Sequence, residues 1–122
     1  MDKRTRQRLE RYEQRYANLA RQVSEIGFIR SGSIATRKAA CGKPSCRCHA
    51  DPPQLHGPYN VWTAKVEGKT VTRQMPDGEA DLYRGWIAND RKLRALVDEM
   101  REISTKAQEL LIQEERRSPK GH

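Results

Sequence analysis

The chain has 122 residues, of which 35% are hydrophobic and 33% are charged, and its formal net charge is +8. A chain this polar cannot build a large hydrophobic core, so it needs stability from a metal ion, from helix pairing or from oligomerisation. It has no apolar run near the roughly 20 residues of a membrane span and no apolar stretch after its basic N-terminus that could serve as a signal peptide, so we expect a cytoplasmic protein without membrane contact.

Residues 1–27 are predicted to form an N-terminal coiled-coil helix, which runs from about Lys3 to Ile26. Its larger apolar side chains recur at alternating steps of three and four residues, as in a heptad seam. These seam positions are Leu9, Tyr12, Tyr16, Leu19, Val23 and Ile26. Gly27 follows and suits the C-cap position, because a residue without Cβ can take positive φ.

Residues 28–76 are predicted to form a small antiparallel β-sheet module. The segment from Ser31 to Lys38 is compatible with a strand, and Tyr59–Val66 and Lys69–Met75 are rich in β-branched and aromatic residues. The dipeptide Glu67-Gly68 between the last two segments is typical of a tight hairpin turn. With that turn, the opposed pairs are Val66 and Lys69, Ala64 and Val71, and Trp62 and Arg73. The stretch 41–58 has no strand pattern and is expected to be a loop.

Residues 77–115 are predicted to form a long C-terminal helix, with Asp77 as its N-cap. Nine seam positions follow one another in phase: Leu82, Trp86, Asn89, Leu93, Leu96, Met100, Ile103, Ala107 and Leu110. The polar Asn89 either fixes the register of a coiled coil or marks a helix break. Residues 116–122 are expected to be a disordered tail. The predicted fold is therefore α+β, with two long helices in an antiparallel coiled-coil hairpin and the sheet module inserted between them.

The two helices differ in length, and this difference predicts a homodimer. The first helix offers six seam residues and the second offers nine, so the far end of the second helix would lack a partner within the chain. A second chain could bury that stretch by pairing symmetrically with it. The expected contact residues are Ile103, Ala107, Leu110, Leu111 and Ile112.

Three cysteines within eight residues carry the main chemical signal of the chain. An odd number at this density, without a secretion signal, favours a metal site in a reducing compartment over disulfides. Cys41, Cys46 and Cys48 offer three thiolates, and His56 at the start of the following strand can supply a fourth ligand. Four protein ligands make a closed site, which is typical of structural rather than catalytic zinc. We therefore predict one structural Zn²⁺ per chain.

Two alternatives to this ligand set stay open from the residues alone. His49 could be the fourth ligand, but it adjoins Cys48, and neighbouring ligands seldom reach one tetrahedral ion without backbone strain, so His56 is favoured. The three thiols could also be inert or redox-active without a metal. An iron–sulfur cluster normally needs four cysteines, and the chain has three.

The chain has Ser-Gly-Ser at 31–33, then the motif Cys-Gly-Lys-Pro-x-Cys-Arg-Cys at 41–48 and His-Gly-Pro-Tyr at 56–59. Together these segments resemble a family of small uncharacterised bacterial proteins. Members of that family often neighbour transposase and other mobile-element genes. The resemblance extends over about residues 27–105, and it implies that Cys41, Cys46, Cys48 and His56 are the motif positions while His49 has no counterpart. At Asn60-Val61-Trp62 the sequence departs slightly from the family pattern.

The positive charge is concentrated in the central module, where residues 28–76 have a net charge of +6. This distribution favours an anionic partner, and we expect nucleic acid, with DNA ahead of RNA. The expected contact residues are Arg30, Arg37, Lys38, Lys43, Arg47, Lys65, Lys69 and Arg73, with Trp62 or Tyr59 stacking on a base. The alternative function is a coiled-coil interaction or assembly factor, with a protein partner and a purely structural zinc site. We expect no enzymatic activity, because the sequence has no phosphate-binding loop, no dinucleotide-binding motif and too few carboxylates in the central module for a two-metal nuclease.

Overall fold

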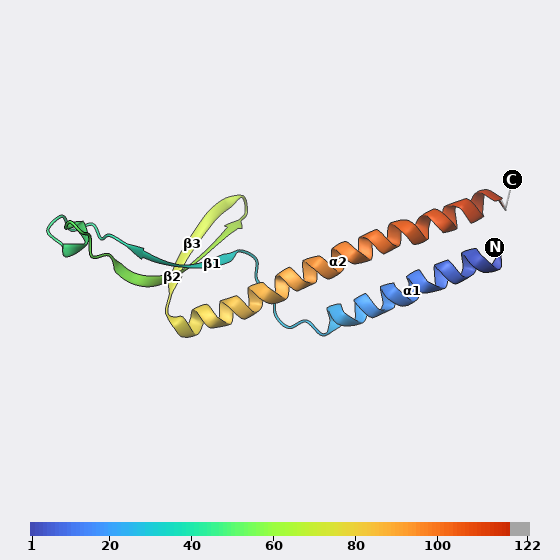
Figure 1. Ribbon diagram of the computed structural model, residues 1–122, viewed down its shortest axis with the longest axis horizontal. Helices are drawn as coiled ribbons and strands as arrows, with labels where there is room; N and C mark the ends of the chain where they lie inside the picture. Colours follow the sequence, from blue (N-terminus) through green and yellow to red (C-terminus); the bar gives the residue numbers. More distant parts are fainter. Residues whose placement is uncertain (118–122) are drawn as a thin grey trace. The chain divides into compact units, whose positions relative to one another are not determined.

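The computed structural model describes residues 1–117, and it has the α+β composition that the sequence predicts. Helix α1 covers Lys3–Ser24 and helix α2 covers Asp77–Arg117, and three antiparallel strands lie between them in the chain (Figure 1). The residues group into two units. One contains Met1–Gly27 and residues 91–117, and the other contains Phe28–Asp90. Neither helix in the described part of the chain has the length and hydropathy needed to cross a bilayer.

Helix α1 begins with a side-chain cap and ends without a glycine. The carboxylate of Asp2 accepts a hydrogen bond from the Thr5 N–H at 2.7 Å, which satisfies one of the free donors of the first turn. At the other end the Glu25 N–H donates to the Gln22 carbonyl and the Ile26 N–H donates to the Val23 carbonyl, both at 3.2 Å, and Glu25 has ordinary right-handed helical angles. The expectation that Gly27 caps the helix is therefore wrong, because the last turn closes without a left-handed residue.

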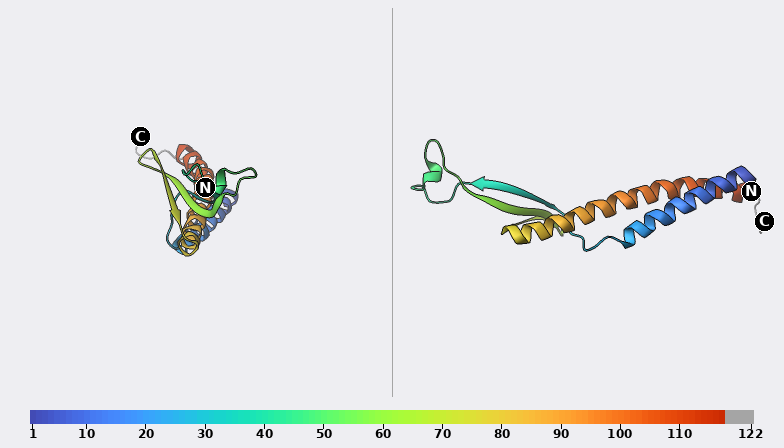
Figure 2. Two further views of the ribbon diagram at one scale, coloured as in Figure 1. Left: turned by 90° about the vertical axis from the view of Figure 1, so that its left-hand side faces the viewer. Right: turned by 60° about the horizontal axis from the view of Figure 1, so that its bottom comes forward.

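Two ion pairs define how α1 and the later part of α2 run relative to each other. The amino group of Met1 lies 2.6 Å from the Glu114 carboxylate, and the Arg15 guanidinium lies 2.7 Å from that of Glu99. The start of α1 thus lies beside the end of α2, and later residues of α1 lie beside earlier residues of α2. The two helices of this unit are therefore antiparallel (Figure 2). Leu19, Leu96 and Leu110 are buried in this unit.

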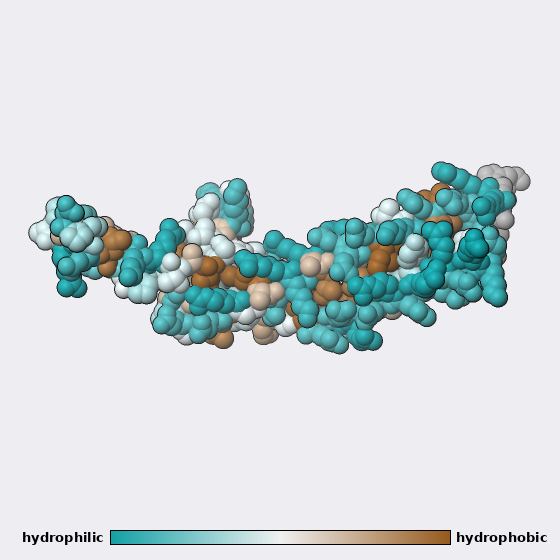
Figure 3. Space-filling view, viewed as in Figure 1, coloured by the Kyte–Doolittle hydropathy of each residue, from teal (hydrophilic) through white to brown (hydrophobic). Residues whose placement is uncertain are grey.

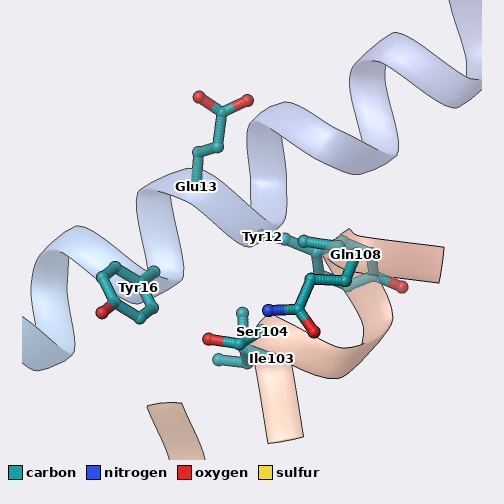
Figure 4. Close-up of a pocket in the computed structure, with 7 residues that line it drawn as sticks. Tyr12, Glu13, Tyr16, Ile103, Ser104 and Gln108 are labelled. Carbon is teal, nitrogen blue, oxygen red and sulfur yellow. The ribbon is translucent and has the colours of Figure 1, made fainter. Parts of the chain in front are cut away.

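The far end of α2 has partners within the chain, contrary to the sequence expectation. Leu110 is only 6% exposed. Ile103 and Ala107 line a groove of about 400 Å³ together with Tyr12 and Tyr16 of α1 (Figure 4). The reason is that the first turns of α2 pack on the sheet, so α1 pairs with the later turns. Of the five proposed contact residues, only Leu111 and Ile112 are half-exposed, at 49% each.

The sheet has the strand order β1-β2-β3, with β1 at Ser33–Ala39, β2 at His56–Val66 and β3 at Lys69–Met75. The predicted register of the hairpin is confirmed. Val66 opposes Lys69, Ala64 opposes Val71, and Trp62 opposes Arg73. Both turn residues have positive φ, 52° at Glu67 and 80° at Gly68, which matches the strand twist of a two-residue hairpin. Strand β2 begins three residues before the expected start, so 56–58 belong to the sheet and not to the loop.

The core of the second unit forms between one face of the sheet and the first turns of α2. Alternate residues of the central strand point to this face, and the buried core residues are Trp62, Ala64, Met75, Ala80, Tyr83 and Ile87. Figure 3 shows that apolar surface gathers in limited areas between wide polar ones. The small core agrees with the low hydrophobic content of the chain.

Helix α2 begins at Asp77 itself, so Asp77 is not the N-cap. The Ala80 N–H donates to the Pro76 carbonyl, while the Asp77 carboxylate accepts a hydrogen bond from the Asn60 side-chain amide at 2.7 Å. The helix is continuous through Asn89, whose side chain donates to the Phe28 carbonyl at 2.8 Å, so no break occurs there. It ends at Arg117. Residues 116 and 117 of the expected tail are therefore helical, and 118–122 lie outside the described residues.

Candidate metal centre

The loop between β1 and β2 folds back on itself and brings its sulfur atoms together. The Cys46 N–H donates to the Lys43 carbonyl at 3.1 Å, which closes a turn with Pro44 and Ser45 at its centre. The His49 N–H then donates to the Cys46 carbonyl at 2.9 Å, within a short 3-10 turn, η1, over Arg47–His49. Two successive tight turns thus direct Cys41, Cys46 and Cys48 toward one point.

The predicted ligand set is brought together in the structure. One ligand atom from each of Cys41, Cys46, Cys48 and His56 lies within 4.8 Å of every other. The sulfurs of Cys41 and Cys48 are 3.6 Å apart, and the Cys46 sulfur is 3.2 Å from Nε2 of His56. A tetrahedral ion with bonds of 2.3 Å to sulfur holds two sulfurs about 3.8 Å apart. Donor types and spacing therefore both fit a metal ion of the zinc class.

His49 is not part of this group of ligands. Its Nε2 atom lies 2.7 Å from the Cys41 carbonyl oxygen, so the imidazole is occupied by the backbone. This contact favours His56 as the fourth ligand, in agreement with the strain argument from the sequence. His49 instead ties the end of η1 to the first cysteine.

The thiols differ in their acidity. Hydrogen bonds from the backbone and side chain of Cys48, and then from His56, lower the pKa of Cys46 to about 6. The Cys41 N–H, 3.3 Å from the Cys48 sulfur, acts to lower the pKa of Cys48, but burial and the neighbouring sulfurs outweigh it and raise that pKa. A metal ion binds thiolates and displaces their protons, so the affinity of the centre must fall in acid.

Gly57 allows the chain to turn directly after His56, and a residue with a side chain does not fit at this position. Its φ is +115°, and an added Cβ would lie 2.9 Å from the Tyr59 nitrogen and 3.0 Å from the Arg37 carbonyl oxygen. The Gly57-Pro58 peptide is cis, as is Asp51-Pro52. The His-Gly-Pro-Tyr motif thus contains a ligand followed by the backbone turn that lets β2 pair closely with β1.

The metal centre is closed on one side and open on the other. Cys48 is 2% exposed. Cys41, Cys46 and His56 are half-buried and line an open cavity of about 440 Å³, which Gly42, Lys43 and Tyr59 complete. Sequence reasoning missed the position of Tyr59 beside the ligands, although its place in the His-Gly-Pro-Tyr motif was a usable signal.

Six of the residues expected to contact nucleic acid are exposed on the module and have no core role. They fall into two groups, one beside the metal centre and one beside the hairpin turn. The first group is Arg37, Lys38, Lys43 and Arg47, and the second is Lys65 and Lys69. The first group surrounds the loop that carries the cysteines, where Asp51 is the only acidic residue between Ser33 and Pro58.

Three other expected contact residues contact the aromatic core, where Trp62 is buried, Arg30 is half-buried and Arg73 is exposed. Trp62 is 4% exposed and donates its indole N–H to the Ser31 carbonyl at 3.0 Å, so the expectation that it stacks on a base is wrong. The Arg30 guanidinium lies over the Tyr83 ring at 4.5 Å and the Trp62 ring at 5.1 Å. Arg73 donates to the Tyr83 hydroxyl at 2.9 Å. Both cations serve the aromatic core, which the sequence pattern did not reveal because Tyr83 lies outside the heptad seam.

The neighbouring Ser-Gly-Ser stretch has a steric explanation. Gly32 has φ +104°, and an added Cβ would lie 2.7 Å from the Trp62 indole nitrogen and 2.6 Å from the Thr63 carbonyl oxygen. Only glycine lets the chain pass this closely over the central strand. The motif therefore belongs to the core of the unit and not to the metal centre.

Comparison with known proteins gives one result. No curated protein and no solved structure matches the chain significantly. A family model described as a domain of unknown function, DUF6788, matches residues 2–84. The match includes all four candidate ligands and most of the sheet unit, which agrees with the resemblance to an uncharacterised family. The chain belongs to the DUF6788 family.

Proposed function

We propose that Cys41, Cys46, Cys48 and His56 bind one zinc ion per chain and that the ion has a structural role. Three thiolates and one imidazole are a common set for structural zinc. All four positions are filled by protein ligands, so the bound ion has no vacant position for a substrate, and we do not propose an enzyme. The ion would link the loop after β1 to the first residue of β2.

The position of the apolar core supports a structural role. Trp62, Met75 and Tyr83 stabilise the sheet near α2, but Cys48 is the only buried side chain between Ser33 and Pro58. That end of the sheet has no apolar core of its own. A zinc ion bound there would supply the missing stability, since metal binding to such sites contributes on the order of 10 kcal/mol to folding.

We further propose that the zinc-bound module binds nucleic acid, with DNA ahead of RNA. The observation that carries this proposal is the group of four exposed cations around the metal loop, Arg37, Lys38, Lys43 and Arg47, with a single acidic residue among them. Three thiolates and a neutral imidazole give the zinc centre a net charge of −1, so the region stays cationic when the ion is bound. The phosphate backbone of a nucleic acid carries the matching negative charge, and lysine and arginine contacts to it provide affinity that does not depend on sequence.

A charge-matched pair of variants tests this proposal. The triple variant Lys38→Gln, Lys43→Gln and Arg47→Gln removes three charges beside the metal loop. The control variant Arg4→Gln, Arg8→Gln and Arg11→Gln removes three exposed charges from α1. Fluorescence anisotropy with labelled DNA should show a clear loss of affinity for the first variant only. The slope of log K against log salt should also fall by about 0.9 for each lost phosphate contact on duplex DNA. Equal losses in both variants would indicate a nonspecific effect of net charge.

A role in mobile elements is part of the same proposal, and it rests on the motif resemblance alone. The alternative function, an assembly factor, is supported by a different observation. Leu111 and Ile112 are each 49% exposed on α2 and adjoin the buried Leu110. We propose this pair as the remaining candidate contact of a homodimer or a protein partner, and coiled-coil packing of α1 against α2 as the scaffold that presents it.

A further inference from the structure

The sheet has a second face that does not pack on α2. In β2, Trp62 and Ala64 point into the core with α2, so their odd-numbered neighbours point to the opposite face. The strand registers then place odd-numbered β1 residues and even-numbered β3 residues beside them. The positions of this open face are Ser33, Ala35, Arg37, Tyr59, Val61, Thr63, Lys65, Thr70, Thr72 and Gln74.

The open face is mainly polar and cationic. None of its ten described positions is Asp or Glu, and Arg37 and Lys65 carry positive charges near its two ends. Val61 is apolar and only 6% exposed. The other side chains are small, hydroxyl-bearing or amide, and among them Tyr59 and Thr63 are half-buried. Such a face attracts an anion and offers hydrogen bonds without an apolar surface for a protein core.

Tyr59 connects this face to the cavity beside the metal centre. It is the register partner of Arg37 across β1 and β2. It also lines the cavity of about 440 Å³ with Lys43 and His56. An aromatic ring that is half-buried by its own strand and bordered by two cations can stack with a flat ring while phosphates contact Arg37 and Lys43.

We infer that the open face binds single-stranded nucleic acid, with one base in the cavity against Tyr59 and the backbone running toward Lys65. This inference rests on the proposed nucleic-acid function and specifies its substrate. Only an unpaired base can present its face to a tyrosine ring, because the bases of a duplex are stacked on each other. The threonine hydroxyls and the Gln74 amide then lie where unpaired base edges can accept or donate hydrogen bonds.

The test compares three labelled oligonucleotides of one sequence, as single-stranded DNA, single-stranded RNA and duplex DNA, by fluorescence anisotropy at fixed salt. The zinc-loaded full chain should bind at least one of the two single-stranded oligonucleotides more tightly than the duplex. Tyr59→Leu should weaken single-strand binding by about 5- to 150-fold, the range for loss of one stacked base, and leave duplex binding unchanged. Tyr59→Phe should retain single-strand affinity. The ratio of the two single-strand affinities identifies the preferred sugar.

A second pair of variants tests the face away from the metal centre. Thr72→Glu places a carboxylate on β3 in the open face, and Gln14→Glu makes the same charge change on exposed α1. Only Thr72→Glu should weaken single-strand binding, with zinc content unchanged in both. If the duplex binds as tightly as the single strands and neither Tyr59→Leu nor Thr72→Glu has an effect, this inference is wrong while the proposed function stands. If none of the oligonucleotides binds, both are wrong.

Discussion

The Sγ atom of Cys46 lies 3.2 Å from the Nε2 atom of His56, although one residue belongs to the loop and the other begins β2. This contact joins the two sides of the loop, because Cys46 lies in the middle of the loop and His56 lies at its end, where β2 begins. A structural metal site requires its cysteine and histidine ligands to lie close together, as these two do. The surrounding segment has few apolar side chains that could stabilise it without a metal ion. His49 provides a control for His56, because its imidazole contacts the Cys41 backbone carbonyl and not the cysteine sulfurs.

We predict that His56→Ala and Cys46→Ser each abolish stoichiometric zinc binding and lower the melting temperature, while His49→Ala retains one zinc per chain. The reason is that the first two variants remove a ligand, whereas the third removes a single hydrogen bond, about 0.5–1.5 kcal/mol. Elemental analysis of protein purified without chelator, followed by thermal melting, measures both effects. Zinc loss in His49→Ala with retention in His56→Ala would reverse the ligand assignment.

A second prediction concerns thiol reactivity in metal-free protein, under conditions where circular dichroism shows that the sheet is retained. The pKa of Cys46 is lowered to about 6 and that of Cys48 is raised, so Cys46 is largely thiolate at pH 7 and Cys48 is not. Because the folded pKa is below the unfolded one, this thiolate stabilises the fold fully above the unfolded pKa and loses its effect as pH falls through about 6. Alkylation mapped by mass spectrometry should modify Cys46 first, with a midpoint near pH 6.

The same experiment has two internal controls. Unfolding in urea should return the Cys46 midpoint to about 8.5, the usual value for a thiol. Bound zinc should protect all three cysteines. Equal alkylation of Cys46 and Cys48 in the folded chain would contradict the hydrogen-bonding account.

The cluster of candidate ligands could be predicted from the sequence more fully than the packing partners of the helices. Spacing in the chain identifies the cluster, because thiols close in sequence need only local turns to meet. The partner of the far end of α2 could not be read in this way. Seam counting assumes that the two helices align from their junction, but Tyr83 and Ile87 pack on the sheet and move the pairing with α1 toward Leu110. Burial of Trp62 was equally invisible, since a strand pattern alone does not say which face a helix will cover.

A third prediction concerns the buried amide of Asn60. Its side-chain nitrogen donates to Asp77 and to the Met75 carbonyl, and its oxygen accepts from Arg84 at 3.2 Å. Asn60→Leu should lower the free energy of unfolding by about 1–3 kcal/mol, because it removes three hydrogen bonds at a buried position and leaves the Met75 carbonyl without this donor. Urea denaturation measures the change. Gln74→Leu removes an exposed amide from the neighbouring strand and should change stability by less than about 0.5 kcal/mol.

A fourth prediction separates stability from binding at Arg30. Its guanidinium lies over the rings of Tyr83, Trp62 and Trp86, so Arg30→Met should lower the free energy of unfolding by about 1–2 kcal/mol. Nucleic-acid affinity of the folded variant should stay unchanged. Lys69→Met removes the same charge from an exposed position of β3, and it should leave stability unchanged. A large loss of nucleic-acid affinity in Arg30→Met, with the melting temperature retained, would return Arg30 to the binding surface.

The last prediction distinguishes packing within the chain from contact between chains on α2. Leu110 is 6% exposed, whereas the adjacent Leu111 and Ile112 are 49% exposed. Leu110→Glu places a charge in the interior of the helical unit, and we expect it to lower the melting temperature with zinc retained. Leu111→Glu/Ile112→Glu should leave the melting temperature of a monomer unchanged, and it should shift a dimer toward monomer in light scattering. If unmodified protein is monomeric at tens of micromolar and the double variant behaves identically, these two side chains do not mediate a homodimer, and assembly through α2 then requires a different protein.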